Sequence, residues 1–151
     1  MKICLELAKK KDVNSKWVYW LNNKQINKYS SKKFKRFNID GQKKFIKDKN
    51  IYKILVKNNL FIGVCEIIKK NHTKRIFEIS YLIGDNRYLN KGIGTILIDM
   101  LKKKIKKNFK GLEVFAGTNK LNIKSQKILL KNNFIKCKTS KENFYFKCQI
   151  K

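Results

Sequence analysis

Ile76-Phe77-Glu78-Ile79-Ser80-Tyr81-Leu82-Ile83-Gly84 and, shortly after it, Asn90-Lys91-Gly92-Ile93-Gly94-Thr95 are the two segments that decide the fold. The first is rich in β-branched and aromatic residues and ends at a Gly-Asp turn signal, which predicts a strand. After the second, apolar residues recur at helical spacing with lysines between them, which predicts an amphipathic helix. A strand, a glycine turn and a helix in this order aim free backbone N–H groups and the positive end of the helix dipole at one place. We therefore expect a phosphate group to bind at this turn.

Two common phosphate-binding motifs do not fit the turn. A P-loop places Gly-Lys directly before Ser or Thr, whereas Lys91 precedes the first glycine, Gly92. The dinucleotide fingerprint needs a third glycine where this chain has Leu97. Its ribose-binding acid belongs at the end of the next strand, whereas Glu113 lies near the start of that strand. The turn is therefore expected to be a pyrophosphate loop of a different kind.

Leu89 through Gly94 resemble the acetyl-CoA loop of the GNAT acetyltransferase superfamily, which reads Gln/Arg-x-x-Gly-x-Gly/Ala. The match fails only at Leu89, where the superfamily has a polar residue. Two more segments resemble the RimJ/RimL-type branch, in the same order along the chain. They are Glu78-Ile79-x-Tyr81-x-Ile83 and Ala116-Gly117-Thr118 followed by Asn122-x-x-Ser125-Gln126-Lys127-x-Leu129-x-Lys131-x-x-Phe134. Asn133 replaces the branch's usual glycine, and asparagine also tolerates the left-handed conformation at a helix end.

The length of 151 residues suits one domain, residues 1–151, and the alternating patterns predict an α/β (α+β) fold. We expect strands at 2–8, 51–57, 60–69, 74–83, 111–117, 134–138 and 143–149. We expect helices starting at Asp12 or Asn14, running from an Asp40 cap through Lys47, spanning 93–108, and running from Asn122 to Lys131. Strands 74–83 and 111–117 should be parallel neighbours, because a helix connects them. The resemblance implies a central mixed, mostly antiparallel sheet flanked by helices, with this parallel pair splayed apart to admit the cofactor arm.

The chain is strongly basic, with 38 Lys and Arg residues against 10 Asp and Glu and a formal net charge of +28. Only three of the basic residues are arginine, and lysine, asparagine and isoleucine are abundant while proline is absent. This composition is typical of an AT-rich genome, so we interpret most lysines as solvated surface. The positive field should still attract anionic ligands and bind nucleic acid non-specifically at low salt. No nucleic-acid module motif is present, so no specific nucleic-acid partner is expected.

Other classes of protein and site are not indicated. No long apolar stretch or signal segment is visible, so we expect no membrane span and a cytoplasmic protein. The four cysteines form no Cys-x-x-Cys pair, and we interpret them as small buried residues on strands: Cys4, Cys65, Cys137 and Cys148. His72, the one histidine, falls in a polar turn and should be exposed. No metal site is expected, because the histidine has no partner ligands near it in the sequence.

Acetyl transfer to an amine needs a base, because a primary alkylamine with a pKa of about 10.4 is protonated at neutral pH. Glu78 is our first candidate, since it lies on the splayed strand and matches the family's glutamate. An ion pair between Glu78 and one of the many lysines is an equally good interpretation. Glu113 on the neighbouring strand is the second candidate, and Asp40 near the presumed acceptor-side loop is the third.

The resemblance also implies roles for backbone groups and for the leaving thiolate. An N–H of Leu82 or Ile83 would hold the thioester carbonyl oxygen. The tyrosine that many members use as acid is replaced by Leu129, so we expect Ser125 to take that part, with a purely structural role in the first helical turn as the alternative. The amine would attack directly in a ternary complex, because no Cys or Ser is placed to form an acyl-enzyme.

Acetyl-CoA is the expected cosubstrate. Its pyrophosphate should contact the backbone of Leu89, Asn90, Lys91, Gly92, Ile93, Gly94 and Thr95. Asn122 should contact the pantetheine arm, and Lys91, Lys127 or Lys131 should pair with phosphates.

The acceptor is expected to be a small amine. The stretch Trp17–Tyr29 resembles acetyltransferases that act on nucleotide-linked amino sugars in surface-polysaccharide and flagellin-sugar modification. The run Lys32-Lys33-Phe34-Lys35-Arg36-Phe37 would hold the nucleotide's diphosphate, or is simply a solvated basic loop. Two alternatives stay open, a ribosomal-protein-type N-terminal acetyltransferase and a basic nucleic-acid-binding module without catalysis. The sequence does not distinguish a monomer from a homodimer.

Overall fold

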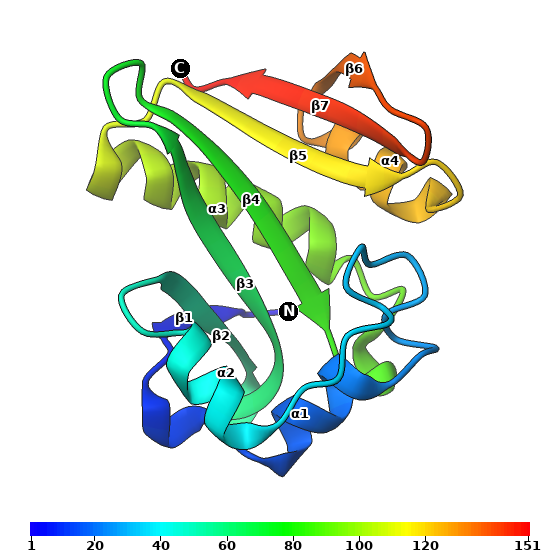
Figure 1. Ribbon diagram of the computed structural model, residues 1–151. Helices are drawn as coiled ribbons and strands as arrows, with labels where there is room; N and C mark the ends of the chain where they lie inside the picture. The colour runs from blue at the N-terminus through cyan, green and yellow to red at the C-terminus, as the bar shows by residue number, and fades with distance from the viewer. The chain divides into compact units, whose positions relative to one another are not determined.

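Seven strands hydrogen bond in the order β1-β2-β3-β4-β5-β7-β6 in the computed structural model, which describes all residues, Met1–Lys151 (Figure 1). The strands are β1 (Cys4–Leu7), β2 (Asn50–Val56), β3 (Leu60–Asn71), β4 (Ile76–Ile83), β5 (Glu113–Asn119), β6 (Ile135–Thr139) and β7 (Asn143–Gln149). The helices are α1 (Ser15–Asn22), α2 (Ile39–Phe45), α3 (Ile93–Phe109) and α4 (Ile123–Lys131). The chain divides into unit 1, residues 1–66 and 81–89, and unit 2, residues 67–80 and 90–151. The element order and the mixed sheet confirm the predicted α/β class.

In unit 1, α1 begins where the sequence predicts and is fastened at both ends by asparagines. Asn14 accepts a hydrogen bond from the Trp17 N–H at 3.0 Å, so Asn14, not Asp12, is the cap. At the other end the buried Asn27 side chain donates to the carbonyls of Leu21 and Asn23 at 3.1 and 3.0 Å. These bonds satisfy carbonyl groups that a helix end leaves without partners. Both ends of α1 are therefore fixed by local hydrogen bonds.

The core of unit 1 is built around Trp17, the first tryptophan of the chain. Trp17 packs in a buried cluster with Val13, Ile46 and Ile51. Trp20 packs against Gly84, where a Cβ would come within 2.0 Å of the indole ring. The glycine at the end of β4 is therefore required by this close approach.

The cap of α2 differs from the sequence expectation. Asn38, and not Asp40, caps the helix, because its side-chain oxygen accepts from the Gly41 N–H at 2.7 Å. Asn38 has the extended conformation of a cap residue, with φ −136°. Asp40 lies inside the first turn, where a carboxylate interacts favourably with the helix dipole. The helix ends at Phe45, two residues before the predicted end at Lys47.

The strand–helix–strand connection that the sequence predicts is present, with α3 joining the parallel strands β4 and β5. One apolar stripe of α3 is buried: Ile93, Leu97, Ile98, Leu101 and Ile105. The helix ends at Phe109, its cap residue Lys110 is left-handed at φ 52°, and the Gly111 N–H donates to the Ile105 carbonyl at 3.2 Å. This turn occupies the residues we assigned to the start of the next strand, so β5 begins at Glu113 and not at 111.

The C-terminal strands of unit 2 form an antiparallel sheet with β5 (Figure 1). β7 pairs with β5 along its whole length, from Glu113↔Gln149 to Asn119↔Asn143. β6 pairs only with β7 and is an edge strand whose residues are all exposed. The last strand of the chain thus lies between β5 and β6.

The four cysteines and the one histidine differ in exposure. All four cysteines are on strands, as expected, but only Cys65 and Cys148 are buried. The prediction was wrong for Cys4 and Cys137, which are exposed because they lie on the two edge strands β1 and β6. His72 is exposed in the turn between β3 and β4. None of the helices combines the length and apolar character that a membrane span requires.

Candidate functional site

The loop before α3 in unit 2 is shaped for an anion. Asn90 and Gly92 are both left-handed, with φ 60° and 76°, and Gly92 occupies the cap position of α3. No side chain caps this helix, and a Cβ built on Gly92 would meet nothing within 4 Å. The first hydrogen bond of α3 runs from the Ile96 N–H to the Gly92 carbonyl. The N–H groups of the first turn are therefore not capped by a side chain, which suits a diphosphate.

A lysine that the sequence argument did not select lies beside this loop. Lys124, in the first turn of α4, donates from Nζ to the side-chain oxygen of Asn90 at 2.8 Å. An ammonium group has three N–H donors, so this bond leaves donors for a ligand. Lys127 and Lys131, the two α4 lysines we selected, are exposed and make no hydrogen bond or ion pair. No sequence signal could single out Lys124 among 35 lysines.

The first turn of α4 holds the next two predicted residues. The Asn122 side-chain oxygen accepts from the Ser125 N–H at 3.2 Å, so Asn122 is the cap of α4. Ser125 is partly buried, and its hydroxyl makes no hydrogen bond. Leu129, where many family members have tyrosine, is a buried core residue with 3% exposure. A tyrosine acid is therefore absent from that position.

Glu78 lies at the point where the parallel strands stop pairing. The β4–β5 register runs from Ile76↔Glu113 to Glu78↔Phe115, although β5 continues to Asn119 in its pairing with β7. Ile79 and Ser80, the next residues of β4 in unit 2, are not paired with β5. The carboxylate of Glu78 forms an ion pair with Lys70 at 3.1 Å, the alternative that the sequence argument left open. Leu82 and Ile83 are the last residues of β4 and belong to unit 1.

The other two candidate carboxylates differ in their surroundings. Glu113 accepts a hydrogen bond from the Gln149 side chain across the β5–β7 pair. Asp40 is exposed, forms no ion pair, and lines a pocket in unit 1. The structure thus gives each of the three carboxylates a different environment, and the partner of Glu78 is a lysine.

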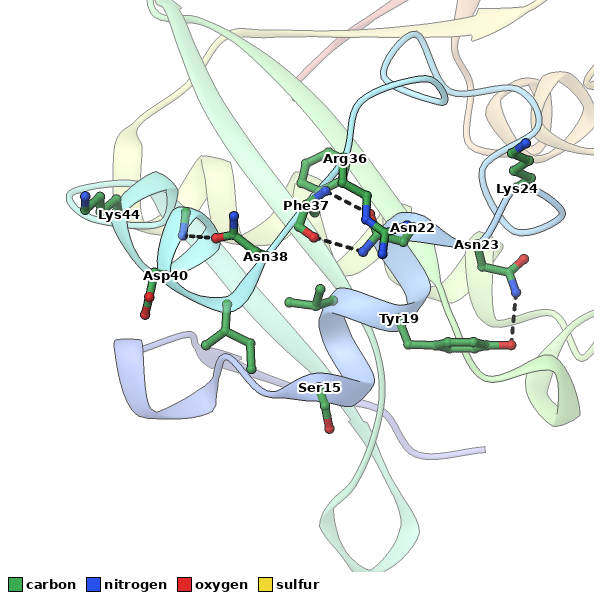
Figure 2. A pocket seen from close by; sticks show the side chains of 13 residues that line it. Ser15, Tyr19, Asn22, Asn23, Lys24, Arg36, Phe37, Asn38, Asp40 and Lys44 are labelled. Atoms are coloured by element: carbon green, nitrogen blue, oxygen red, sulfur yellow. Dashed lines mark hydrogen bonds between the residues drawn. The ribbon is translucent and has the colours of Figure 1, made fainter.

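That pocket lies between α1, α2 and the segment that connects them, and we call it the α1–α2 pocket (Figure 2). Its volume is about 1140 Å³. Three cations and one carboxylate are among its lining residues: Lys24, Arg36, Lys44 and Asp40. None of these four side chains forms an ion pair within the protein. Figure 2 shows Arg36 between Lys44 on one side and Lys24 on the other.

The frame of the α1–α2 pocket is fixed by side-chain amides. Asn22 donates from Nδ2 to the Phe37 carbonyl at 2.9 Å and accepts from the Phe37 N–H at 2.8 Å (Figure 2). The Asn23 side chain donates to the Tyr19 hydroxyl at 3.0 Å. Asn22, Asn23 and Asn27 belong to the stretch that resembles amino-sugar acetyltransferases. Here all three hold the backbone or a neighbouring side chain.

The sequence model of the acetyltransferase (GNAT) domain matches residues 2–135. The chain belongs to the GNAT acetyltransferase family. It is therefore an acetyl-CoA-dependent N-acetyltransferase, and the interpretation as a non-catalytic nucleic-acid-binding module is set aside. No curated protein matches the acetyltransferase in sequence. The finer assignment to the RimJ/RimL-type branch stays a prediction.

Solved structures of similar fold agree with the family. Spermidine N-acetyltransferase from Vibrio cholerae, in complex with CoA and spermine, is similar with a TM-score of 0.85 and 14% identity, covering 98% of this chain and 95% of that one. An aminoglycoside acetyltransferase in complex with coenzyme A and kanamycin has a TM-score of 0.80 at 15% identity, with coverage of 98% and 95%. A domain from Methanocaldococcus jannaschii has a TM-score of 0.81 at 21% identity, with 98% of each chain covered. At these identities the likeness concerns the fold. No group of three or more His, Cys, Asp or Glu side chains gathers in the acetyltransferase to hold a metal ion.

Proposed function

We propose that the acetyltransferase acetylates the primary amine of a nucleotide-linked amino sugar by direct attack in a ternary complex. The amine nitrogen bonds to the thioester carbonyl carbon, the carbon–sulfur bond breaks, and the thiolate leaves with a proton. The acceptor amine loses its own proton to a base. Each step needs only the two substrates and protein groups, so no acyl-enzyme is required.

The observation that supports this proposal is the positive charge of the chain and of the α1–α2 pocket. The chain has a net charge of +28, and the α1–α2 pocket contains three cations against one carboxylate. A polycationic acceptor, such as those bound in two of the similar structures, would be repelled by this field. A nucleotide-linked amino sugar carries a reactive amine on a molecule of net negative charge. Electrostatic steering therefore favours that class of acceptor.

The loop before α3 supports the placement of acetyl-CoA. We assign the diphosphate to the backbone of Leu89 through Thr95, with the open N–H groups at the start of α3 as the principal donors. Lys124 adds a side-chain cation beside the loop, since it is already bonded to Asn90. Asn122 is the proposed contact for the pantetheine arm, and Lys91 and Lys127 are the proposed partners of the phosphates. Acetyl-CoA itself supplies the activated acetyl group.

Glu78 is the proposed base. It is the last residue of β4 that pairs with β5. Lys70 Nζ contacts its carboxylate at 3.1 Å. The N–H of Leu82 or Ile83 is the proposed donor to the thioester oxygen, and Ser125 is the proposed acid for the thiolate. The unbonded hydroxyl of Ser125 is compatible with this part.

A protein N-terminus is the second candidate acceptor, because the segments Glu78–Ile83 and Ala116–Phe134 resemble the RimJ/RimL-type branch. The two candidates are separated by one assay of thiol release from acetyl-CoA. The panel contains a nucleotide-linked amino sugar, the same sugar without the nucleotide, peptide N-termini, spermidine and an aminoglycoside. We expect the highest kcat/KM for the nucleotide-linked sugar. Higher values for spermidine or for peptides would contradict the proposed acceptor and leave the family intact.

A further inference from the structure

We infer that the α1–α2 pocket is a binding site for a phosphate-bearing ligand, with Arg36 as its central contact. This inference rests in part on the proposed function, because the phosphate of a nucleotide-linked acceptor is the first candidate. The same chemistry is offered by a separate phosphorylated compound. The experiment below distinguishes the two sources.

Arg36 is distinguished from the other arginines of the chain. Arg87 is engaged by Asp85, with bonds of 3.0 Å from Nε and 2.7 Å from an Nη nitrogen. Arg75 lies in the exposed turn between β3 and β4 with a left-handed backbone. Arg36 alone lines a pocket, and it forms no ion pair. A guanidinium group presents a planar fork of donors that matches two phosphate oxygens.

The backbone next to Arg36 is held in place before any ligand binds. Both the N–H and the carbonyl of Phe37 are bonded to the Asn22 side chain, and Asn38 caps α2 directly afterwards. The guanidinium group therefore projects from a fixed position between two helices (Figure 2). A side chain on a held backbone loses less conformational freedom on binding than one on a mobile loop.

The hydrogen-bonding groups left over in the pocket are mainly donors. The Asn22 carbonyl oxygen is occupied by Phe37, the Asn38 oxygen by Gly41, and the Asn23 oxygen by Ile26. The cations Lys24, Arg36 and Lys44 add only donors, as does the unused Asn38 amide nitrogen. Asp40 is the one charged acceptor among the lining residues. A site with this balance suits a ligand made of acceptor oxygens, which is the character of a phosphate or diphosphate.

Size and arrangement fit a nucleotide and not a bare ion. The volume of about 1140 Å³ exceeds what a single phosphate fills. The cations are spread across the pocket, with Arg36 between Lys44 and Lys24 (Figure 2). Tyr19 presents an aromatic side chain with 61% of its surface exposed at the same pocket. A base has a π-face that stacks on such a ring.

The test measures UDP binding by calorimetry in the presence of saturating CoA, so that the anion site before α3 is already filled. Four proteins are compared: the natural sequence, Arg36→Gln, Arg36→Lys and Arg75→Gln. The last removes the same charge from an exposed turn, so it measures non-specific attraction. Measurements at about 50 mM and about 200 mM salt separate steering from contact. Uridine serves as the ligand without phosphate.

We expect Arg36→Gln to weaken UDP binding about tenfold or more, while Arg75→Gln changes it less than about twofold. Arg36→Lys should keep the charge and still lose affinity, because an ammonium cannot form the two parallel bonds. Uridine should bind far more weakly than UDP. Equal losses in Arg36→Gln and Arg75→Gln, or no UDP binding once CoA is saturating, would overturn the inference.

Turnover measurements distinguish the two possible sources of the phosphate, the acceptor itself and a separate phosphorylated compound. If the phosphate belongs to the acceptor, Arg36→Gln raises KM for a UDP-linked amino sugar and leaves KM for the free amino sugar unchanged. If Arg36-dependent UDP binding persists while no amino sugar is acetylated, the pocket holds a separate phosphorylated ligand and the proposed acceptor is wrong. If amino sugars are acetylated but Arg36→Gln binds UDP as tightly as the natural sequence does, the proposed function is supported and the inference about the pocket is wrong.

Discussion

Lys124 Nζ donates to the side-chain oxygen of Asn90 at 2.8 Å, which joins the first turn of α4 to the loop before α3. Asn90 itself is left-handed at φ 60°, a conformation that asparagine adopts more readily than most residues. One bond thus connects an unusual backbone conformation, a cation and the open N–H groups of a helix. The loop and the cation are in place together in the free protein.

Lys124→Met should weaken CoA binding by about tenfold, equal to about 1.4 kcal/mol, because it removes a charge-assisted contact to phosphate and keeps the aliphatic stem. The loss should shrink as salt rises. Calorimetry with CoA at low and high salt checks this. Lys138→Met, on the exposed edge strand β6 of the same unit, is the control, and an equal loss in both variants would show that only the general positive field matters.

Gly92→Val should weaken CoA binding more than Gly92→Asn. A β-branched residue is strained at φ 76°, whereas asparagine tolerates this region. A Cβ here meets nothing within 4 Å in the free protein, so the folded state should tolerate both substitutions with a modest loss of stability. Thermal unfolding without ligand, measured beside CoA affinity, separates the two effects. Unchanged CoA affinity in Gly92→Val would mean that the diphosphate binds elsewhere.

Glu78→Gln should lower kcat by about a hundredfold and change KM little, because it removes a base and keeps the shape of the side chain. The rise of kcat/KM with pH that a base produces should flatten. Steady-state rates over a pH series measure both. Glu113→Gln is the control, since that carboxylate lies on the partner strand and is bonded to Gln149. A full rate in Glu78→Gln at all pH values would limit Glu78 to its ion pair with Lys70.

Asp85 should contribute to stability at neutral pH and lose that contribution in acid. The hydrogen bond from Arg87 holds the pKa of the Asp85 carboxyl below its usual 3.8. A lowered pKa in the folded state means that the stabilisation is present above about 3.8 and disappears as pH falls through the lower folded value. Asp85→Asn keeps an oxygen for the Arg87 N–H and loses the charge. Denaturant unfolding should show the natural protein more stable at pH 7 and the two proteins converging in strong acid; a constant difference would contradict the assignment.

The sequence was most informative where periodicity and turn chemistry agree. The amphipathic α3 was predicted to within one residue of its observed end, because its apolar stripe and its glycine start leave no other interpretation. β2 and β3 were both predicted, and they are joined by two left-handed residues, Asn58 and Asn59, with φ 59° and 56°. We placed the start of β5 too early because Lys110 is left-handed, whereas glycine or asparagine is the usual sequence signal for a left-handed helix end. Tertiary contacts fix that turn.

Side-chain partners were beyond the sequence. Nothing in the pattern distinguishes Asn38 from Asp40 as the cap of α2, since both residue types favour that position. The pairing of Lys124 with Asn90 and of Lys70 with Glu78 joins residues on different elements, and 35 lysines offer too many choices. The α1–α2 pocket depends on the bonds between Asn22 and Phe37, which are 15 residues apart. Such contacts become definite only when the chain is folded.

The exposed edge strand β6 has a consequence for how copies of this protein meet. Lys136 and Lys138 lie along it, beside the exposed Ile135. An incoming β-strand from another molecule would have to desolvate and approach these ammonium groups, which discourages fibril-like stacking. The lysines on β6 thus disfavour pairing of this edge with a strand of another molecule. Added electrolyte shields their charges and should weaken this effect.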